Sequence, residues 1–313
     1  MAQFPSSSGA SGIWSLTDVR NSLMGSNWPL MPPEGNTAAW FGGGSGPVST
    51  VDRITFATDT ATASVRGPLS LARRSLAAAG NTTDAWFGGG YGPVSRVDRI
   101  TYATDTATAS VRGPLSSSRY YLGAAGNTTD AWFGGGVGNL STVDRITYTT
   151  DTATASVRGP LSLARGYLAA AGNSTDAWFG GGYAMYSTVD RITYATDTAT
   201  ASVRGPLSQG RRVISATGNS DYGWFAGGHY PNISTVDRIT YATDTATASV
   251  RGPLSVARAG SAAAGNSTDG WFCAGYIFSI VDRITYATDT AATSTRGPLS
   301  AARYALGAAA GIQ

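Results

Sequence analysis

The chain has 313 residues and a formal charge of +3, and its apolar content of 42% is high enough to exclude a disordered chain. Every basic residue is an arginine, but no run of arginines suits nucleic acid or a membrane surface. The single cysteine excludes an internal disulfide, and no apolar run approaches the about 18 residues that a membrane span requires. We expect no secretory signal and a soluble protein made in a cytoplasm.

The first predicted element is a short helix over residues 16–24, inside a segment, residues 1–35, that lies outside the repeats described below. Ser15 is placed to cap this helix, with Asp18 as the acidic partner of a capping box. A helix of about nine residues is marginal in water by itself, so its apolar face must dock on the rest of the chain or on another protein. The predicted anchor contacts are Trp14, Leu16, Val19, Leu23 and Trp28.

From residue 36 to residue 313 the sequence repeats with a period of 45 to 47 residues. An aromatic and glycine-rich element, Trp-Phe-Gly-Gly-Gly in its commonest form, begins at Trp40, Trp86, Trp132, Trp178, Trp224 and Trp271. A Val-Asp-Arg-Ile-Thr element begins at Val51, Val97, Val143, Val189, Val236 and Val281. A fixed period in this range is typical of β-propellers and other repeat arrays.

Each full repeat contains four strand-like runs, which in the second repeat are residues 73–79, 85–89, 97–104 and 108–115. The third run is rich in β-branched and aromatic residues, as strands are. Turn-forming Asn, Thr and Asp residues lie between the runs. The small residues of the first run suit the crowded axis of a propeller, so we place this run innermost and the fourth outermost.

The two ends of the repeat region predict how a ring would close. The first repeat begins without its innermost strand, whereas residues 302–311 have the sequence of that strand. We therefore predict an all-β fold in which residues 36–313 form a six-bladed propeller of four-stranded blades. The C-terminal strand joins the first blade and leaves only short outer edges. An open solenoid would need distinct capping repeats, and the sequence has none.

Residues that could perform chemistry are few. His229 is the only histidine, so no histidine-rich metal site can form. Cys273 replaces a glycine of the other repeats and is interpreted as a small buried filler rather than a nucleophile. The repeated aspartates, such as Asp98, lack calcium-binding spacing and are expected to pair with arginines such as Arg73 or Arg112. We expect no enzymatic activity, no metal and no cofactor.

The most informative positions are those at which the repeats differ. They fall between the second and third strands and between one blade and the next, and an antiparallel four-stranded blade places both connections on one face. Tyrosine and arginine are common there and act as interface anchors, and aromatic rings also stack on sugars. The sequences of exposed loops in duplicated repeats also diverge when the loops have no function. The predicted face for a partner protein or glycan comprises Tyr91, Tyr120, Tyr121, Tyr167, Tyr183, Met185, Tyr186, Arg212, His229, Tyr230, Tyr276, Phe278 and Tyr304.

The repeat resembles a kelch motif. The matching features are Arg73 at the first strand, the three glycines after Phe87, Tyr102 before a turn, and Leu115 followed by serine at the end of the fourth strand. The resemblance covers residues 36–313 and implies a propeller. The repeat lacks the tryptophan that kelch motifs have on the fourth strand, so no kelch subfamily follows from it.

Residues 11–16 (Ser-Gly-Ile-Trp-Ser-Leu) and 25–29 (Gly-Ser-Asn-Trp-Pro) are similar to the opening of structural proteins from tailed phages of marine bacteria, of the cyanophage type. The near-identical Asp-Arg-Ile-Thr-Tyr repeats also resemble those of such phages. This resemblance implies a virion component of the head, neck or tail. It also implies that residues 1–35 bind other virion proteins, while the propeller contacts a protein or the host surface.

Three functions remain open at this point. The first is a non-enzymatic virion protein, and the second is a stand-alone carbohydrate-binding propeller of the lectin type. The third, an enzyme, is the weakest because acids, bases and metal ligands are so few, and only a hydrolase that uses carboxylates alone would fit.

Overall fold

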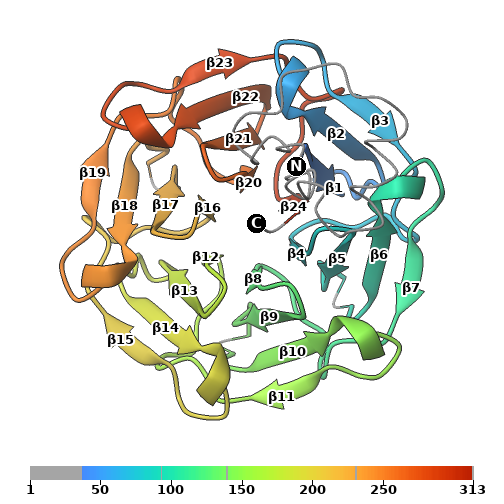
Figure 1. Ribbon diagram of the computed structural model, residues 1–313, viewed down its shortest axis with the longest axis horizontal. Coiled ribbons are helices and arrows are strands. Elements are labelled where there is room, and N and C mark those ends of the chain that lie inside the picture. The colour runs from blue at the N-terminus through green and yellow to red at the C-terminus, as the bar shows by residue number, and fades with distance from the viewer. Residues whose placement is uncertain (1–36, 93, 139, 230, 312–313) are drawn as a thin grey trace, which may run out of the picture. The chain divides into compact units, whose positions relative to one another are not determined.

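The computed structural model describes residues 37–311, except residues 93, 139 and 230. These residues form six four-stranded antiparallel sheets, arranged around a central channel as the blades of a propeller (Figure 1). The prediction of a six-bladed all-β propeller is therefore confirmed. The predicted helix and its anchor residues lie outside the described residues. Within the described residues, no helix is long and apolar enough to cross a bilayer.

The strands of each blade follow one another outward from the channel (Figure 1). For blades 1 to 6 the innermost strands are β24 (Gly307–Ala310), β4 (Ala77–Gly80), β8 (Gly123–Gly126), β12 (Ala169–Gly172), β16 (Ser215–Gly218) and β20 (Ala262–Gly265). The second strands are β1 (Ala38–Gly42), β5 (Asp84–Gly88), β9 (Asp130–Gly134), β13 (Asp176–Gly180), β17 (Tyr222–Ala226) and β21 (Asp269–Gly275).

The outer half of each blade is equally regular. The third strands are β2 (Val51–Thr55), β6 (Val97–Thr101), β10 (Val143–Thr147), β14 (Val189–Thr193), β18 (Val236–Thr240) and β22 (Phe278–Thr285). Each is followed by a single 3-10 turn, namely η1 (Phe56–Thr58), η2 (Tyr102–Thr104), η3 (Tyr148–Thr150), η4 (Tyr194–Thr196), η5 (Tyr241–Thr243) and η6 (Tyr286–Thr288). The outermost strands are β3 (Ser64–Arg66), β7 (Ser110–Arg112), β11 (Ser156–Arg158), β15 (Ser202–Arg204), β19 (Ser249–Arg251) and β23 (Ser294–Arg296).

Blade 1 is assembled from both ends of the repeat region. Strand β24 pairs antiparallel with β1, with Ala310 opposite Ala39 and Gly307 opposite Gly42. This pairing confirms the predicted closure. It also covers the inner edge of β1, whose N–H and C=O groups would otherwise lie open at the channel.

Three strands are shorter than predicted. The third run ends at Thr101, because η2 begins at the next residue. The innermost run begins at Ala77 rather than at Arg73, which lies buried in the connection before it. There the Arg73 guanidinium forms an ion pair with Asp98 at 3.1 Å and donates to the Phe87 carbonyl at 2.8 Å, which confirms the predicted arginine–aspartate pair. The outermost strand covers only Ser110–Arg112.

Neighbouring blades are joined by a recurring group of side chains, which we call the blade-junction cluster. Between blades 1 and 2, Asp105 accepts hydrogen bonds from Trp40 Nε1 at 2.9 Å and from Arg53 at 3.0 Å. Arg66 lies 3.5 Å from the same carboxylate, and the Tyr102 ring stacks on Trp40 with centroids 3.9 Å apart. The buried carboxylate is thus compensated by cations and a donor from the neighbouring blade.

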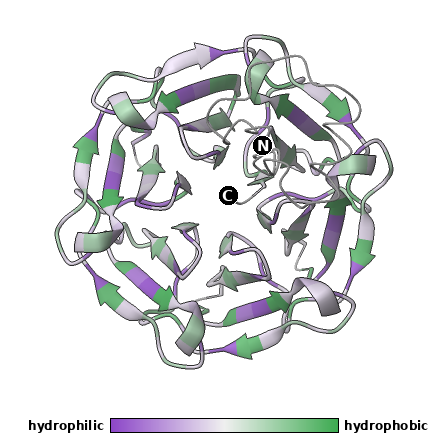
Figure 2. Ribbon diagram, viewed as in Figure 1, coloured by the Kyte–Doolittle hydropathy of each residue, from purple (hydrophilic) through white to green (hydrophobic). Residues whose placement is uncertain are grey.

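The cluster recurs at each junction, including the one between blades 6 and 1. There Trp271 Nε1 donates to Asp59 at 2.9 Å, and Phe56 replaces the stacking tyrosine. Figure 2 shows a hydrophilic band across the middle of the third strands, where Asp and Arg are adjacent in the Val-Asp-Arg-Ile-Thr sequence, with apolar residues on either side. The arginines of the repeat therefore pair with buried aspartates within and between the blades.

Candidate functional site

The variable connections lie on one face of the propeller, which we call the loop face. In blades 1 to 5, one residue of the loop between the second and third strands hydrogen-bonds to the connection that enters the same blade. Tyr91 N–H donates to the Arg74 carbonyl at 2.8 Å, and His229 N–H donates to the Arg212 carbonyl at 2.9 Å. The opposite face, which we call the turn face, carries the nearly invariant turns between the first and second strands.

Five tyrosines from the loops and connections of blades 2 to 4 form a continuous row, the tyrosine row. Tyr91 meets Tyr120 edge-on with ring centroids 5.1 Å apart, and Tyr120 is 5.7 Å from Tyr121. Tyr121 stacks on Tyr167 at 3.9 Å, and Tyr167 is 5.6 Å from Tyr183. Residues that are far apart in sequence thus share one aromatic surface.

An arginine lies at each end of the tyrosine row. The Arg74 guanidinium lies 4.4 Å from the centroid of the Tyr91 ring, and the Arg212 guanidinium lies 4.9 Å from that of Tyr183. Both are cation–π contacts, which fix the arginine heads on the aromatic surface. Burial raises the pKa of the Tyr167 hydroxyl, the neighbouring tyrosines raise it further, and Arg212 opposes them. This hydroxyl therefore remains a donor at neutral pH.

Three members of the tyrosine row, Tyr121, Tyr167 and Tyr183, form one wall of a hollow at the mouth of the channel, the mouth pocket. On the opposite side, Tyr276 and Tyr304 lie with their ring centroids 5.7 Å apart. The pocket encloses about 460 Å³, within the range of small-molecule sites. It is lined by Tyr121, Tyr167, Tyr183, Arg212, Val213, His229, Asn232, Ala259, Gly260, Tyr276 and Tyr304.

The floor of the mouth pocket contains a closed circle of backbone hydrogen bonds, the connection ring. One residue from each blade-to-blade connection belongs to it, and each donates its N–H to the carbonyl of the preceding member at 2.6 to 3.0 Å. All of its members have left-handed backbone, with φ from 53 to 70°. They are Ser75, Tyr121, Tyr167, Val213, Gly260 and Ala305.

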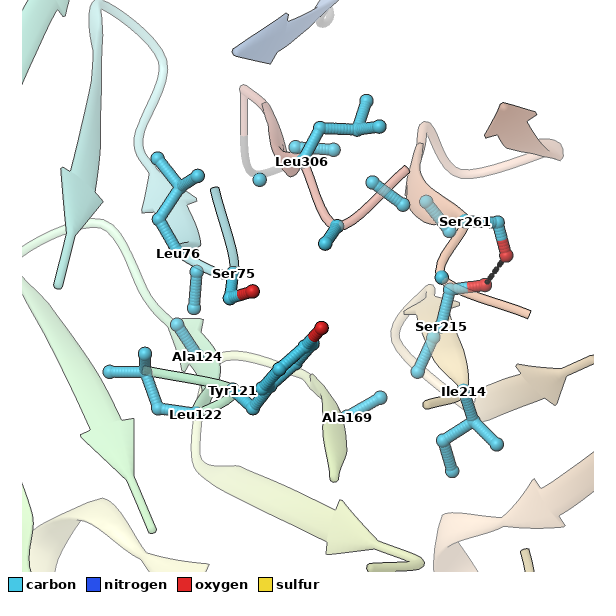
Figure 3. A pocket seen from close by; sticks show the side chains of 18 of the residues that line it. Ser75, Leu76, Tyr121, Leu122, Ala124, Ala169, Ile214, Ser215, Ser261 and Leu306 are labelled. Atoms are coloured by element: carbon cyan, nitrogen blue, oxygen red, sulfur yellow. Dashed lines mark hydrogen bonds between the residues drawn. The ribbon is translucent and has the colours of Figure 1, made fainter. Parts of the chain in front are cut away.

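The connection ring also sets how open the channel is. Figure 3 shows the Tyr121 side chain reaching toward the axis, while Ser215 and Ser261 hydrogen-bond to each other across two blades at 2.8 Å. The space at this level is only about 100 Å³. The channel is therefore narrow below the mouth pocket.

Several predicted face residues lie outside the mouth pocket. Tyr91 and Tyr120 belong to the tyrosine row but not to the pocket lining. Met185 is exposed and Tyr186 half-buried in the loop of blade 4, and Phe278 is half-buried in β22. Tyr230 lies outside the described residues.

Sequence reasoning missed Val213, Asn232, Ala259 and Gly260, which complete the pocket. Three of them are small or apolar and offer no chemical signal. Their positions did offer one, because Val213 and Gly260 occupy the same place in the connection as Tyr121 and Tyr167. An alignment of the connections alone would have selected Val213 and Gly260.

Cys273, which could have acted as a nucleophile, is packed in the interior. Cys273 is fully buried in β21, and burial raises the pKa of its thiol well above the usual value, so it stays protonated. Among the described residues, no group of three or more His, Cys, Asp or Glu side chains is placed to hold a metal ion. Comparison with known protein families and with curated proteins found no match to this chain.

Proposed function

We propose that this protein is a non-enzymatic recognition propeller of a phage virion, which contacts a host surface through its loop face. The supporting observation is that the differences between otherwise near-identical blades gather on that face, where tyrosines and arginines from several blades meet. Rigid aromatic side chains and arginines supply much of the binding energy in protein interfaces. A face used only for packing would need none of this variation.

The virion assignment rests on the similarity of residues 11–16 and 25–29 to phage structural proteins. In this proposal residues 1–35 anchor the propeller to a head, neck or tail protein, and the repeat is of the kelch type. The loop face is then free to meet the cell.

A second candidate function is a stand-alone carbohydrate-binding propeller. It is favoured by the mouth pocket, because Tyr121, Tyr183 and Tyr276 present aromatic surface around a hollow of small-molecule size. Aromatic rings of this kind stack on the apolar faces of sugars. The two candidates differ in whether the chain needs an anchor.

Deletion of residues 1–35 separates these candidates. If the virion proposal is correct, the shortened chain folds, shown by an unchanged circular dichroism spectrum, but is missing from purified particles. Incorporation at the normal level would contradict the anchor.

The face itself is tested by Tyr183→Ala combined with Tyr276→Ala, with the exposed turn-face residue Thr128→Ala as the matched control. We expect the double variant, but not the control, to lose particle adsorption to cells or glycan binding. Unchanged adsorption and unchanged glycan binding in the double variant would contradict a role for the loop face.

A further inference from the structure

The loop face is free of exposed carboxylates within the described residues. Two aspartates per blade, typified by Asp52 and Asp59, are buried and paired with arginines. The remaining described aspartates all lie at the turns between first and second strands, on the turn face. These are Asp84, Asp130, Asp176, Asp221 and Asp269.

Positive charge has the opposite distribution. Three arginines of each blade belong to the repeated arginine–aspartate pairs, such as Arg53 and Arg66 with Asp105. The described arginines beyond this pattern are Arg74, Arg96 and Arg212, and all three lie in the loops or connections of the loop face. Together these arginines give this face a positive potential that attracts anions.

The mouth pocket places one of these cations beside aromatic surface. Arg212 and Tyr183 both line the pocket, with the guanidinium 4.9 Å from the ring centroid. A guanidinium recognises a carboxylate or sulfate through paired N–H donors. The stacked Tyr121 and Tyr167 rings offer a flat surface beside it. Cation and aromatic plane together match a ring-shaped ligand with an attached anionic group.

We propose that the mouth pocket binds an acidic sugar residue, one that bears a carboxylate or a sulfate, with Arg212 holding the anion and the tyrosines holding the sugar ring. This inference rests on the proposed recognition role of the loop face. It adds to that role a ligand class and a discrimination against uncharged saccharides.

The test measures binding of the full chain to three tetrasaccharides by calorimetry: a uronate oligomer, a sulfated galactan oligomer and neutral maltotetraose. We expect at least one acidic oligomer to bind about tenfold or more tightly than maltotetraose, and more weakly as salt is raised. The acidic oligomer that binds more tightly shows whether the preferred anion is a carboxylate or a sulfate. Equal affinity for acidic and neutral oligomers, or no binding of either acidic oligomer, would overturn the inference.

Arg212→Gln and Arg74→Gln form a matched pair, because the two arginines occupy equivalent positions in their blades and each contacts a tyrosine of the row. Both variants remove one charge from the loop face, but only Arg212 lines the mouth pocket. We expect Arg212→Gln to weaken acidic-oligomer binding about tenfold and Arg74→Gln to change it by less than about twofold. Equal effects would contradict a specific role for Arg212.

Failure of this inference is distinguishable from failure of the proposed function. If the Tyr183 and Tyr276 double variant still abolishes adsorption to cells while acidic oligomers do not bind, the loop face recognises something else. The proposed function then stands, and the acidic-sugar assignment is wrong.

Discussion

At the scale of single residues, the connection ring concentrates backbone strain at the floor of the mouth pocket. A residue other than glycine in left-handed conformation costs roughly 1–2 kcal/mol. Only Gly260 among the ring members avoids this cost. The strain persists because hydrogen bonds on both sides hold every member in place.

Ser75→Gly should therefore stabilise the protein. The substitution removes the left-handed strain at φ 61° and also a buried hydroxyl that has no hydrogen-bond partner. Against the roughly 0.5–1 kcal/mol entropic cost of glycine, we expect a net gain of about 1 kcal/mol in the free energy of unfolding. Urea denaturation would measure it. The reverse change at the equivalent position, Gly260→Ser, should lower stability, and a gain there would contradict this account.

The buried tyrosines of the 3-10 turns predict a pH effect. Tyr194 is 8% exposed and its hydroxyl has no hydrogen-bond partner, while Phe56 occupies the same position in blade 1. Burial, with Asp176 nearby, raises the pKa of Tyr194 above its ordinary value of 10.0. A raised folded-state pKa means that stability is fully present below about pH 10 and is lost as the pH rises further.

Tyr194→Phe should consequently be neutral or stabilising by up to about 1 kcal/mol at pH 7. Above about pH 10 its stability should fall less steeply than that of the parent chain, because one fewer buried phenol must ionise on unfolding. Denaturation midpoints at about pH 8 and pH 11 would measure both effects. An identical pH slope in the two proteins would contradict the assignment.

At the scale of elements, the blade-junction cluster holds one blade to the next. Asp151 at the junction of blades 2 and 3 accepts from Trp86 at 2.9 Å and pairs with Arg99 and Arg112 at 3.1 and 3.3 Å. Removing its charge leaves Arg112 without an anion and Arg99 with only Asp84, which lies 3.5 Å away.

Asp151→Asn should lower the free energy of unfolding by about 3–5 kcal/mol, the usual result of breaking a buried pair from one side. The control is Asp221→Asn at an exposed turn, which should cost less than about 0.5 kcal/mol. Chemical denaturation would distinguish the two values. Comparable effects would show that the cluster contributes little.

Features that depend on sequence pattern could be predicted, whereas features that depend on packing between blades could not. The repeat period predicted the blades and their number, and the sequences at the two ends of the repeat region predicted the closure, because each depends on pattern alone. The third strand was predicted to run to Thr104, but Tyr102 turns away to stack on Trp40 of the neighbouring blade. That contact depends on how blades pack. Likewise, antiparallel topology predicted the shared face, whereas the mouth pocket depends on the left-handed backbone of Val213 and Gly260.

At the scale of the whole propeller, closure depends on the short strand β24. Its backbone hydrogen bonds to β1 join residues that are more than 260 positions apart in the chain. Removal of residues 307–313 would expose the inner edge of β1 and leave blade 1 with three strands. We expect this truncated chain to lose its single cooperative thermal transition and to aggregate, whereas removal of residues 312–313 alone should not change the transition. Equal transitions in the two shortened chains would contradict a closing role for β24.

The pairing of β24 with β1 also has a consequence for biosynthesis. The four strands of each of blades 2 to 6 are contiguous in the chain, so all of them are synthesised before residues 307–310 can complete blade 1. A chain that ends before β24 therefore lacks the strand that covers the inner edge of β1. Only a chain synthesised through β24 can close the ring, so closure is the last step that synthesis makes possible.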